Sequence, residues 1–111
     1  PPLRASDAGR AVFVTTGRVL RPKAYWGMYG ATKAGMEHLV QTWAEEVAKT
    51  PLRVNLADPG IVATKMREQA MPGEDPATLP RPADIAPALA ALCLPAETRH
   101  GARIEIAPPA R

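Results

Sequence analysis

The sequence predicts an α/β fold in which a parallel sheet of about three strands is flanked by two main helices. One observation is an unbroken apolar and β-branched run, "AVFVT", at residues 11–15. The others are a segment of helical periodicity at residues 26–49 and a second strand-like run at residues 52–57. A strand, a long helix and a second strand in this order form a right-handed βαβ unit, so the two strands are expected to be parallel neighbours in one sheet.

The first predicted strand runs from Ala11 to Thr15, and its continuous apolar pattern is typical of a strand buried on both faces. The helix is expected from Trp26 to Lys49 because its apolar residues recur at spacings of three and four. These residues are Met36, Leu39, Val40, Trp43 and Val47. The residues assigned to the opposite, polar face are Glu37, Gln41 and Glu45.

The second half of the chain supplies the remaining elements. A strand from Leu52 to Ala57 is ended by Pro59 and Gly60. The proline-rich residues 65–82 are expected to form a mobile loop with at most a short helix at residues 64–70. The segment "PADIAPALAALCL" predicts a helix capped by Asp84, and residues 102–107 predict a short last strand. The residues expected along the apolar side of that helix are Ile85, Leu89, Leu92 and Cys93.

Composition limits the function classes. A length of 111 residues allows one small domain. The fourteen basic residues form no run, which argues against nucleic-acid binding, and no apolar segment has the length of a membrane span. Cys93 is the single cysteine, so an intrachain disulfide is impossible, and a reducing cytoplasm and a packing role for Cys93 are expected. His38 and His100 show no metal-ligand spacing, and we expect no metal site and solvated or partner-facing imidazoles.

Tyr29 and Lys33 carry the clearest chemical signal. Residues four apart on a helix project from the same face. A phenol titrates near pH 10, and a neighbouring ammonium favours the phenolate, so this tyrosine could exchange a proton with a carbonyl or an alcohol at neutral pH. The alternative is a solvated pair at the surface.

Two further segments accompany this pair. "TTG", Thr15 to Gly17, lies at the carboxyl end of the first predicted strand, and "PGIVAT", Pro59 to Thr64, follows the second. Ligands of open α/β sheets bind beyond the carboxyl ends of the strands. All three segments are therefore expected to face the same crevice.

Together these motifs resemble those of the short-chain dehydrogenase/reductase family, over residues 5–107. In that family a hydroxyl residue ends one strand, a Tyr-x-x-x-Lys motif follows on the next helix, and Pro-Gly-x-x-x-Thr follows the next strand. The resemblance implies a Rossmann-like fold, an NAD or NADP cofactor and a carbonyl or alcohol substrate. It implies that Tyr29 is the catalytic acid/base, and that Lys33 lowers the tyrosine pKa and holds the cofactor ribose. The family's serine is replaced here by Thr16, which keeps the hydroxyl and adds a methyl group.

The resemblance also implies the remaining assignments. Pro59 and Gly60 would form the cofactor-binding turn, and the Val62 backbone and the Thr64 hydroxyl would hold the nicotinamide carboxamide. Residues 65–82 would be the substrate lid.

No G-x-G-x-x-G motif occurs in the 111 residues. We therefore expect residues 1–111 to be a single partial domain, the C-terminal catalytic half of an NAD(P)-binding Rossmann-fold domain. Such a half is expected to associate with the missing N-terminal half or as a homo-oligomer, a dimer or tetramer. The alternative is a catalytically incompetent remnant that acts as an interaction module.

Overall fold

The computed structural model describes residues 2–62 and 65–106. Its strands are β1 (Arg10–Val14), β2 (Arg53–Asp58) and β3 (Arg103–Glu105). Its α-helices are α1 (Pro2–Ala5), α2 (Gly27–Glu46), α3 (Lys65–Ala70) and α4 (Pro82–Ala91). Two 3₁₀ turns, η1 (Gly17–Val19) and η2 (Pro76–Thr78), complete the described elements.

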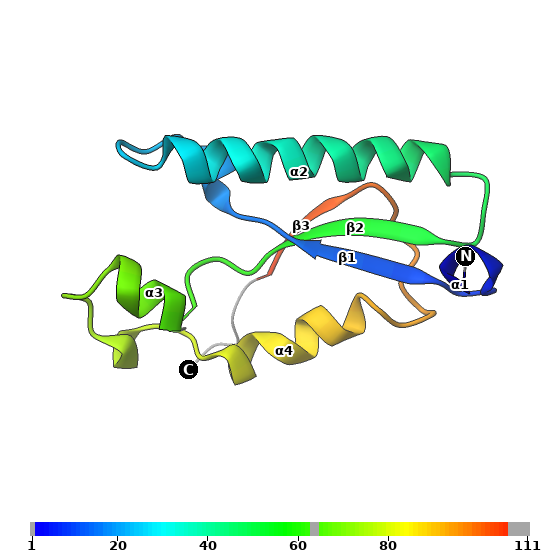
Figure 1. The fold of residues 1–111 in the computed structure, drawn as a ribbon. Helices are drawn as coiled ribbons and strands as arrows, with labels where there is room; N and C mark the ends of the chain where they lie inside the picture. Colours follow the sequence, from blue (N-terminus) through cyan, green and yellow to red (C-terminus); the bar gives the residue numbers. More distant parts are fainter. Residues whose placement is uncertain (1, 63–64, 107–111) are drawn as a thin grey trace.

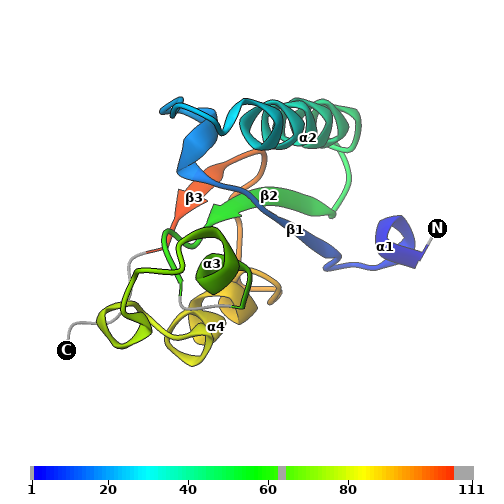
Figure 2. The same cartoon turned by 60° about the vertical axis from the view of Figure 1, so that its left-hand side comes forward.

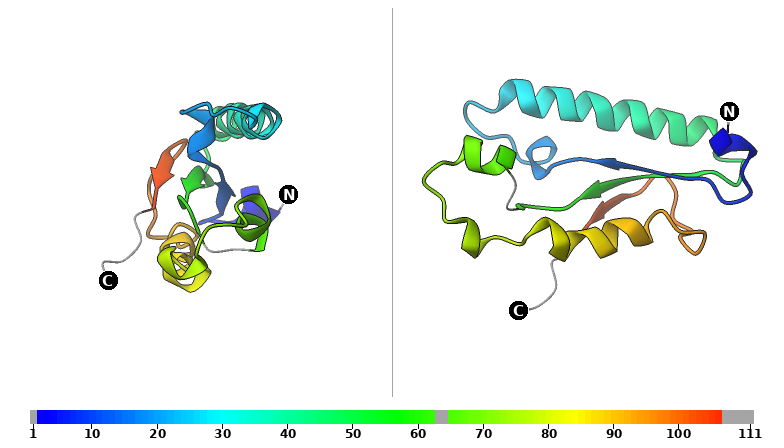
Figure 3. Two further views of the ribbon diagram at one scale, coloured as in Figure 1. Left: turned by 90° about the vertical axis from the view of Figure 1, so that its left-hand side faces the viewer. Right: turned by 60° about the horizontal axis from the view of Figure 1, so that its bottom comes forward.

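The three strands form one parallel sheet in the order β1-β2-β3. In the register, Val14 pairs with Ala57 and Leu56 pairs with Arg103. Helix α2 covers one face of the sheet and α4 lies on the other (Figure 1), so the domain has three layers, as the end-on view shows (Figure 3). The predicted α/β fold with a parallel three-stranded sheet and two main helices is confirmed.

The apolar core lies between α2 and β2. Helix α2 contributes Val40 and Ala44, and its cap residue Val47 joins them. They pack on Leu52, Val54 and Leu56 at or next to the central strand. Trp43 extends this core toward β1, where its ring meets Phe13 edge to face at a centroid distance of 6.2 Å. An edge-to-face aromatic pair stabilises the fold by about 1 kcal/mol beyond the contribution of the apolar area that it buries.

The prediction that the first strand is buried on both faces was wrong. Residues Arg10 to Phe13 are only half-buried and Val14 is 46% exposed, whereas β2 is almost completely buried. The reason is position, because β1 pairs with β2 alone among the described strands and forms an edge of the sheet (Figure 2). An apolar run identifies a strand, but it does not show whether a neighbour covers the strand.

Two assignments on α2 were also wrong. Leu39, expected in the core, is 70% exposed, and Glu37, expected on the polar face, is only 6% exposed. Glu37 lies three residues before Val40 and seven before Ala44, so the helical repeat places all three on the inner face. Gln41 and Glu45 are exposed as expected.

Helix α4 begins as the sequence indicates. The Asp84 carboxylate accepts a hydrogen bond from the Arg81 amide at 2.8 Å, and this contact satisfies a donor at the helix start. Ile85 and Leu92 are buried, but Cys93 is exposed. The predicted packing role of Cys93 was wrong because α4 ends at Ala91, so the helical repeat no longer sets the direction of residue 93.

The segment before β3 is fixed by two side chains. Arg99 donates to both carboxylate oxygens of Glu97, at 2.8 and 2.9 Å, and these bonds lower the pKa of Glu97 to about 2. His100 is half-buried rather than solvated: its Nδ1 accepts from the Val54 amide at 3.1 Å, and its Nε2 lies 2.7 Å from the Ala44 carbonyl oxygen. His100 therefore joins the end of α2 to the central strand, which corrects the expectation of a solvated or partner-facing imidazole.

Candidate active site at the carboxyl edge of the sheet

The predicted site segments meet at one edge of the sheet. Strands β1 and β2 run in the same direction and end near the first turns of α2, and α3 lies beyond that end (Figure 1). The carboxyl ends of parallel strands are the usual ligand-binding edge of an open α/β sheet.

Tyr29 and Lys33 lie in the first turns of α2, and both are half-buried. The Lys33 ammonium donates a hydrogen bond to the Val14 carbonyl oxygen, with Nζ and O 3.4 Å apart. The Tyr29 ring packs edge to face against Trp26, with ring centroids 5.6 Å apart. The tyrosine–lysine face of α2 is thus directed at the end of β1.

Two threonines follow β1, and they have different environments. Thr15 is buried: its amide donates to the Ala57 carbonyl at 2.8 Å, and its hydroxyl donates to the Glu37 carboxylate. Thr16 is half-buried, and its hydroxyl oxygen accepts a hydrogen bond from the Arg18 amide at 3.3 Å. Of the two hydroxyls, that of Thr16 is the more accessible to a ligand.

The turn after β2 contains the Pro-Gly motif. Gly60 has a φ of +72°, which favours glycine, and a β-carbon at this position would meet no atom of the described residues within 4 Å. The Gly60 amide donates to Asp58 Oδ1 at 2.9 Å. Val62 is half-buried, and the predicted Thr64 lies outside the described residues.

Sequence reasoning missed a buried ionic cluster below these segments, formed by Glu37, Asp58 and Arg103. The guanidinium of Arg103 lies 3.4 Å from Glu37 Oε1 and 3.3 Å from Asp58 Oδ2. It also donates to the Thr16 carbonyl oxygen at 2.6 Å. The sequence contained one signal, because a charged residue at an inward helical position requires a buried partner.

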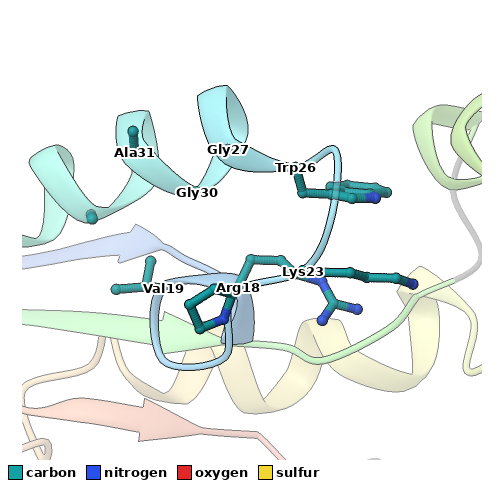
Figure 4. Close-up of a pocket in the computed structure, with 9 residues that line it drawn as sticks. Arg18, Val19, Lys23, Trp26, Gly27, Gly30 and Ala31 are labelled. Atoms are coloured by element: carbon teal, nitrogen blue, oxygen red, sulfur yellow. The ribbon is translucent and has the colours of Figure 1, made fainter.

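A pocket of about 280 Å³ opens beside the start of α2. It is lined by Arg18, Val19, Pro22, Lys23, Trp26, Gly27, Gly30, Ala31 and Ala34. Figure 4 shows the side chains of Lys23 and Trp26 extending in the same direction from the segment that leads into the helix. The Arg18 guanidinium carbon lies 5.9 Å from the centre of the Trp26 ring, so Trp26 has both a packing and a pocket-lining position.

The segment at residues 65–82 contains α3, which lies where the sequence predicts a short helix, and the 3₁₀ turn η2. Arg67 forms two hydrogen bonds to Glu74, at 2.8 and 2.9 Å. These bonds lower the pKa of the Glu74 carboxyl from its ordinary value and raise that of Arg67. The pair therefore joins α3 to the residues that follow it.

Within residues 2–62 and 65–106, no group of three or more histidine, cysteine, aspartate or glutamate side chains could hold a metal ion. In the same ranges no helix has the length and apolar character needed to cross a lipid bilayer.

Comparison with known proteins matches residues 1–75 to the family model described as short chain dehydrogenase. A similar relative is the uncharacterized oxidoreductase YciK of Escherichia coli (strain K12), which is 44% identical over 87 residues. That alignment covers 78% of this chain but 34% of YciK. The chain therefore spans about a third of the length of this relative.

Solved structures give the same picture. A short chain dehydrogenase from Salmonella enterica serovar Typhi superimposes with a TM-score of 0.86 at 36% identity, over 93% of this chain and 43% of that protein. A short chain dehydrogenase from Shigella flexneri 2a, solved as a complex with NADP, gives a TM-score of 0.85 at 38% identity with the same coverage. The fold described above is therefore shared with these proteins over 93% of this chain.

Proposed function

Because the chain belongs to the short-chain dehydrogenase family, we propose that it forms the C-terminal part of an NAD(P)-dependent oxidoreductase acting on a carbonyl or an alcohol. The observation that carries the proposal is the contact between Lys33 Nζ and the Val14 carbonyl. This contact brings the Tyr29–Lys33 face of α2 to the strand end that bears Thr16. A proton donor, a cation and a hydroxyl at one sheet edge suit the reduction of a carbonyl.

Each residue has a distinct task in this reaction. Tyr29 donates a proton to the carbonyl oxygen during reduction and accepts it from the alcohol during oxidation. The Lys33 ammonium, which donates to the Val14 carbonyl oxygen, places a positive charge one helical turn after Tyr29. The Thr16 hydroxyl orients the substrate carbonyl.

Most of the proposed cofactor-binding residues belong to the segment after β2, and Lys33 joins them from α2. Pro59 and Gly60 form the turn, the Val62 backbone and the Thr64 hydroxyl hold the carboxamide, and Lys33 holds the ribose. The open space beside Gly60 fits this role, since a ligand can approach the backbone there without meeting a side chain. A nicotinamide cofactor, NAD or NADP, supplies the hydride when it is bound. Two solved relatives were obtained with NADP and NADPH.

Residues 65–82 are proposed to cover the substrate, because α3 lies beyond the carboxyl ends of the strands (Figure 1). The substrate is a small carbonyl or alcohol compound. The complete site requires the phosphate-binding segment of a full-length protein, supplied within one chain or by association.

The test uses the full-length protein that contains these residues. Tyr29→Phe removes the acidic hydroxyl and keeps the ring, so kcat is expected to fall by at least about 100-fold with little change in NADPH affinity. Tyr25→Phe is the matched control, because Tyr25 is fully exposed four residues earlier. Steady-state reduction of a panel of aldehydes and ketones is the measurement. Wild-type turnover by Tyr29→Phe would refute the assignment.

A second candidate is an interaction module without catalysis, favoured by the exposure of large apolar side chains on α2. Met28 is 82% exposed and Leu39 is 70% exposed. Titration of NADH and NADPH into the 111-residue chain, followed by tryptophan fluorescence, separates the two. Saturable micromolar binding supports the oxidoreductase, and no binding leaves the module, or a fragment of a longer protein, as the better description.

A further inference from the structure

Arg103 touches all the segments that form the candidate site. It comes from β3, yet its guanidinium reaches the carbonyl oxygen of Thr16 after β1 at 2.6 Å. The same group contacts Glu37 on α2 and Asp58 at the end of β2, at 3.4 and 3.3 Å. One side chain at the start of β3 thus connects α2 to the carboxyl ends of β1 and β2.

The environment makes these contacts specific to arginine. The side chains of Glu37 and Asp58 are each 8% exposed and that of Arg103 is 15% exposed, so the charges have little access to water. Three different nitrogens of the guanidinium serve Glu37, Thr16 and Asp58, and Nη1 also lies 3.8 Å from the exposed Glu105 carboxylate. A lysine ammonium concentrates its donors at one point and could not span the same three groups.

The three closest partners of Arg103 each lead to a residue with a proposed task. The bonded carbonyl belongs to Thr16 itself. Glu37 lies one helical turn after Lys33 and also accepts the Thr15 hydroxyl proton in a hydrogen bond. Asp58 accepts the hydrogen bond of the Gly60 amide, which shapes the proposed cofactor turn.

From these contacts we propose that Arg103 is a positioning residue that sets the place of the Thr16 hydroxyl relative to Tyr29. The inference rests on the proposed function, because it assigns Arg103 a role in that reaction. Arg103 acts through the Thr16 backbone and touches no reacting atom. A small displacement of such a hydroxyl is costly, since an error of about 1 Å in a catalytic group can reduce a rate by about 100-fold.

The experiment is a double-mutant cycle between Arg103→Lys and Thr16→Val in the full-length protein. Arg103→Lys alone is expected to lower kcat by about tenfold with a smaller change in the KM for NADPH. In the Thr16→Val background, where no hydroxyl remains to be placed, it is expected to lower kcat by less than about twofold. Equal losses in the two backgrounds, or no loss in either, would overturn the proposal.

Arg99→Lys is the matched control. Arg99 also binds a carboxylate through two nitrogens, but its side chain is 52% exposed and lies away from Thr16. Its replacement is expected to leave kcat unchanged in both backgrounds.

Amide hydrogen exchange supplies a readout that does not depend on activity. The Val19 amide donates to the same Thr16 carbonyl that Arg103 holds, and the Gly60 amide donates to Asp58. Arg103→Lys is expected to speed exchange at both by about tenfold and to leave the Thr50 amide unchanged. Unchanged exchange at Val19 and Gly60, or faster exchange at Thr50 as well, would overturn a positioning role. A full-length protein without turnover would refute the proposed function, while exchange would still decide whether Arg103 holds these segments.

Discussion

At the scale of single residues, a hydroxyl can donate to a substrate only when its proton is not already used in another hydrogen bond. Thr15 and Thr16 are adjacent and identical in type, yet the Thr15 hydroxyl is committed to the Glu37 carboxylate. Thr16 makes one long hydrogen bond through its hydroxyl oxygen, as an acceptor from the Arg18 amide. Its O–H proton is therefore the better candidate to orient a substrate carbonyl.

This difference gives a test on Thr16. In the full-length protein, Thr16→Ser keeps the hydroxyl and removes a methyl group, so kcat is expected to equal or exceed that of the wild type. Thr16→Val keeps the shape and removes the hydroxyl, so kcat is expected to fall by about tenfold or more. Initial rates with one substrate measure both changes. Equal rates for all three proteins would mean that Thr16 is only a structural residue.

The spacing of Tyr29 and Lys33 could be read from the sequence because it is local, and a helix converts a separation of four into a shared face. The burial of Glu37 and its contact with Arg103 could not be read in the same way. Glu37 and Arg103 are 66 residues apart in the sequence, and their contact exists only after β3 has joined the sheet. Local patterns identify which residues share a face, but they do not identify what that face meets.

At the scale of elements, the joint between α2 and β2 depends on a residue outside both. The imidazole of His100 lies between the Val54 amide and the Ala44 carbonyl oxygen. A neutral ring with its proton on Nε2 accepts from the first and donates to the second. The two bonds fix the end of α2 against the central strand at the side opposite the candidate site.

His100→Ala is expected to lower the free energy of unfolding of the full-length protein by about 2 kcal/mol, because the buried Val54 amide would lose its partner. Denaturant unfolding followed by circular dichroism measures this change. His38→Ala, at an exposed position of α2, serves as the control and is expected to change stability by less than about 0.5 kcal/mol. Equal free energies of unfolding for the two variants would contradict the role of His100 in joining α2 to β2.

Element types were predictable because each has a local signature, whereas element environments were not. The apolar run at residues 11–15 formed a strand as expected, with β1 at Arg10–Val14, but the run by itself does not show how many neighbouring strands cover it. Helix α2 was expected to end at Lys49 and ends at Glu46, and the cap residue Val47 still packs in the core. Sequence patterns of period two and 3.6 indicate whether a segment forms a strand or a helix. The burial of its residues depends on the segments that pack against it elsewhere in the fold.

At the scale of the whole molecule, the described domain has surfaces that suit association. Strand β1 offers one unpaired side to solvent, and Val14 at its end is 46% exposed. On α2, Met28 and Leu39 are eleven residues apart and therefore lie on nearly the same face, away from the sheet. Unpaired strand edges and apolar helix faces of this kind favour pairing with another chain or segment.

We therefore expect the 111-residue chain on its own to form oligomers or aggregates rather than a stable monomer. Intact mass spectrometry followed by light scattering over a range of concentrations measures the state of the purified chain. Val14→Lys places a charge on the open edge and is expected to reduce strand-mediated association, since lysine at edge strands discourages pairing. Leu39→Lys places a charge on the exposed face of α2 and is expected to reduce association through that helix. Comparing the two variants separates pairing at the strand edge from packing of the helix. A wild-type chain that stays monomeric at high concentration and unfolds cooperatively would contradict this expectation, because β1 and α2 would then be stable with no further strand or helix to cover them.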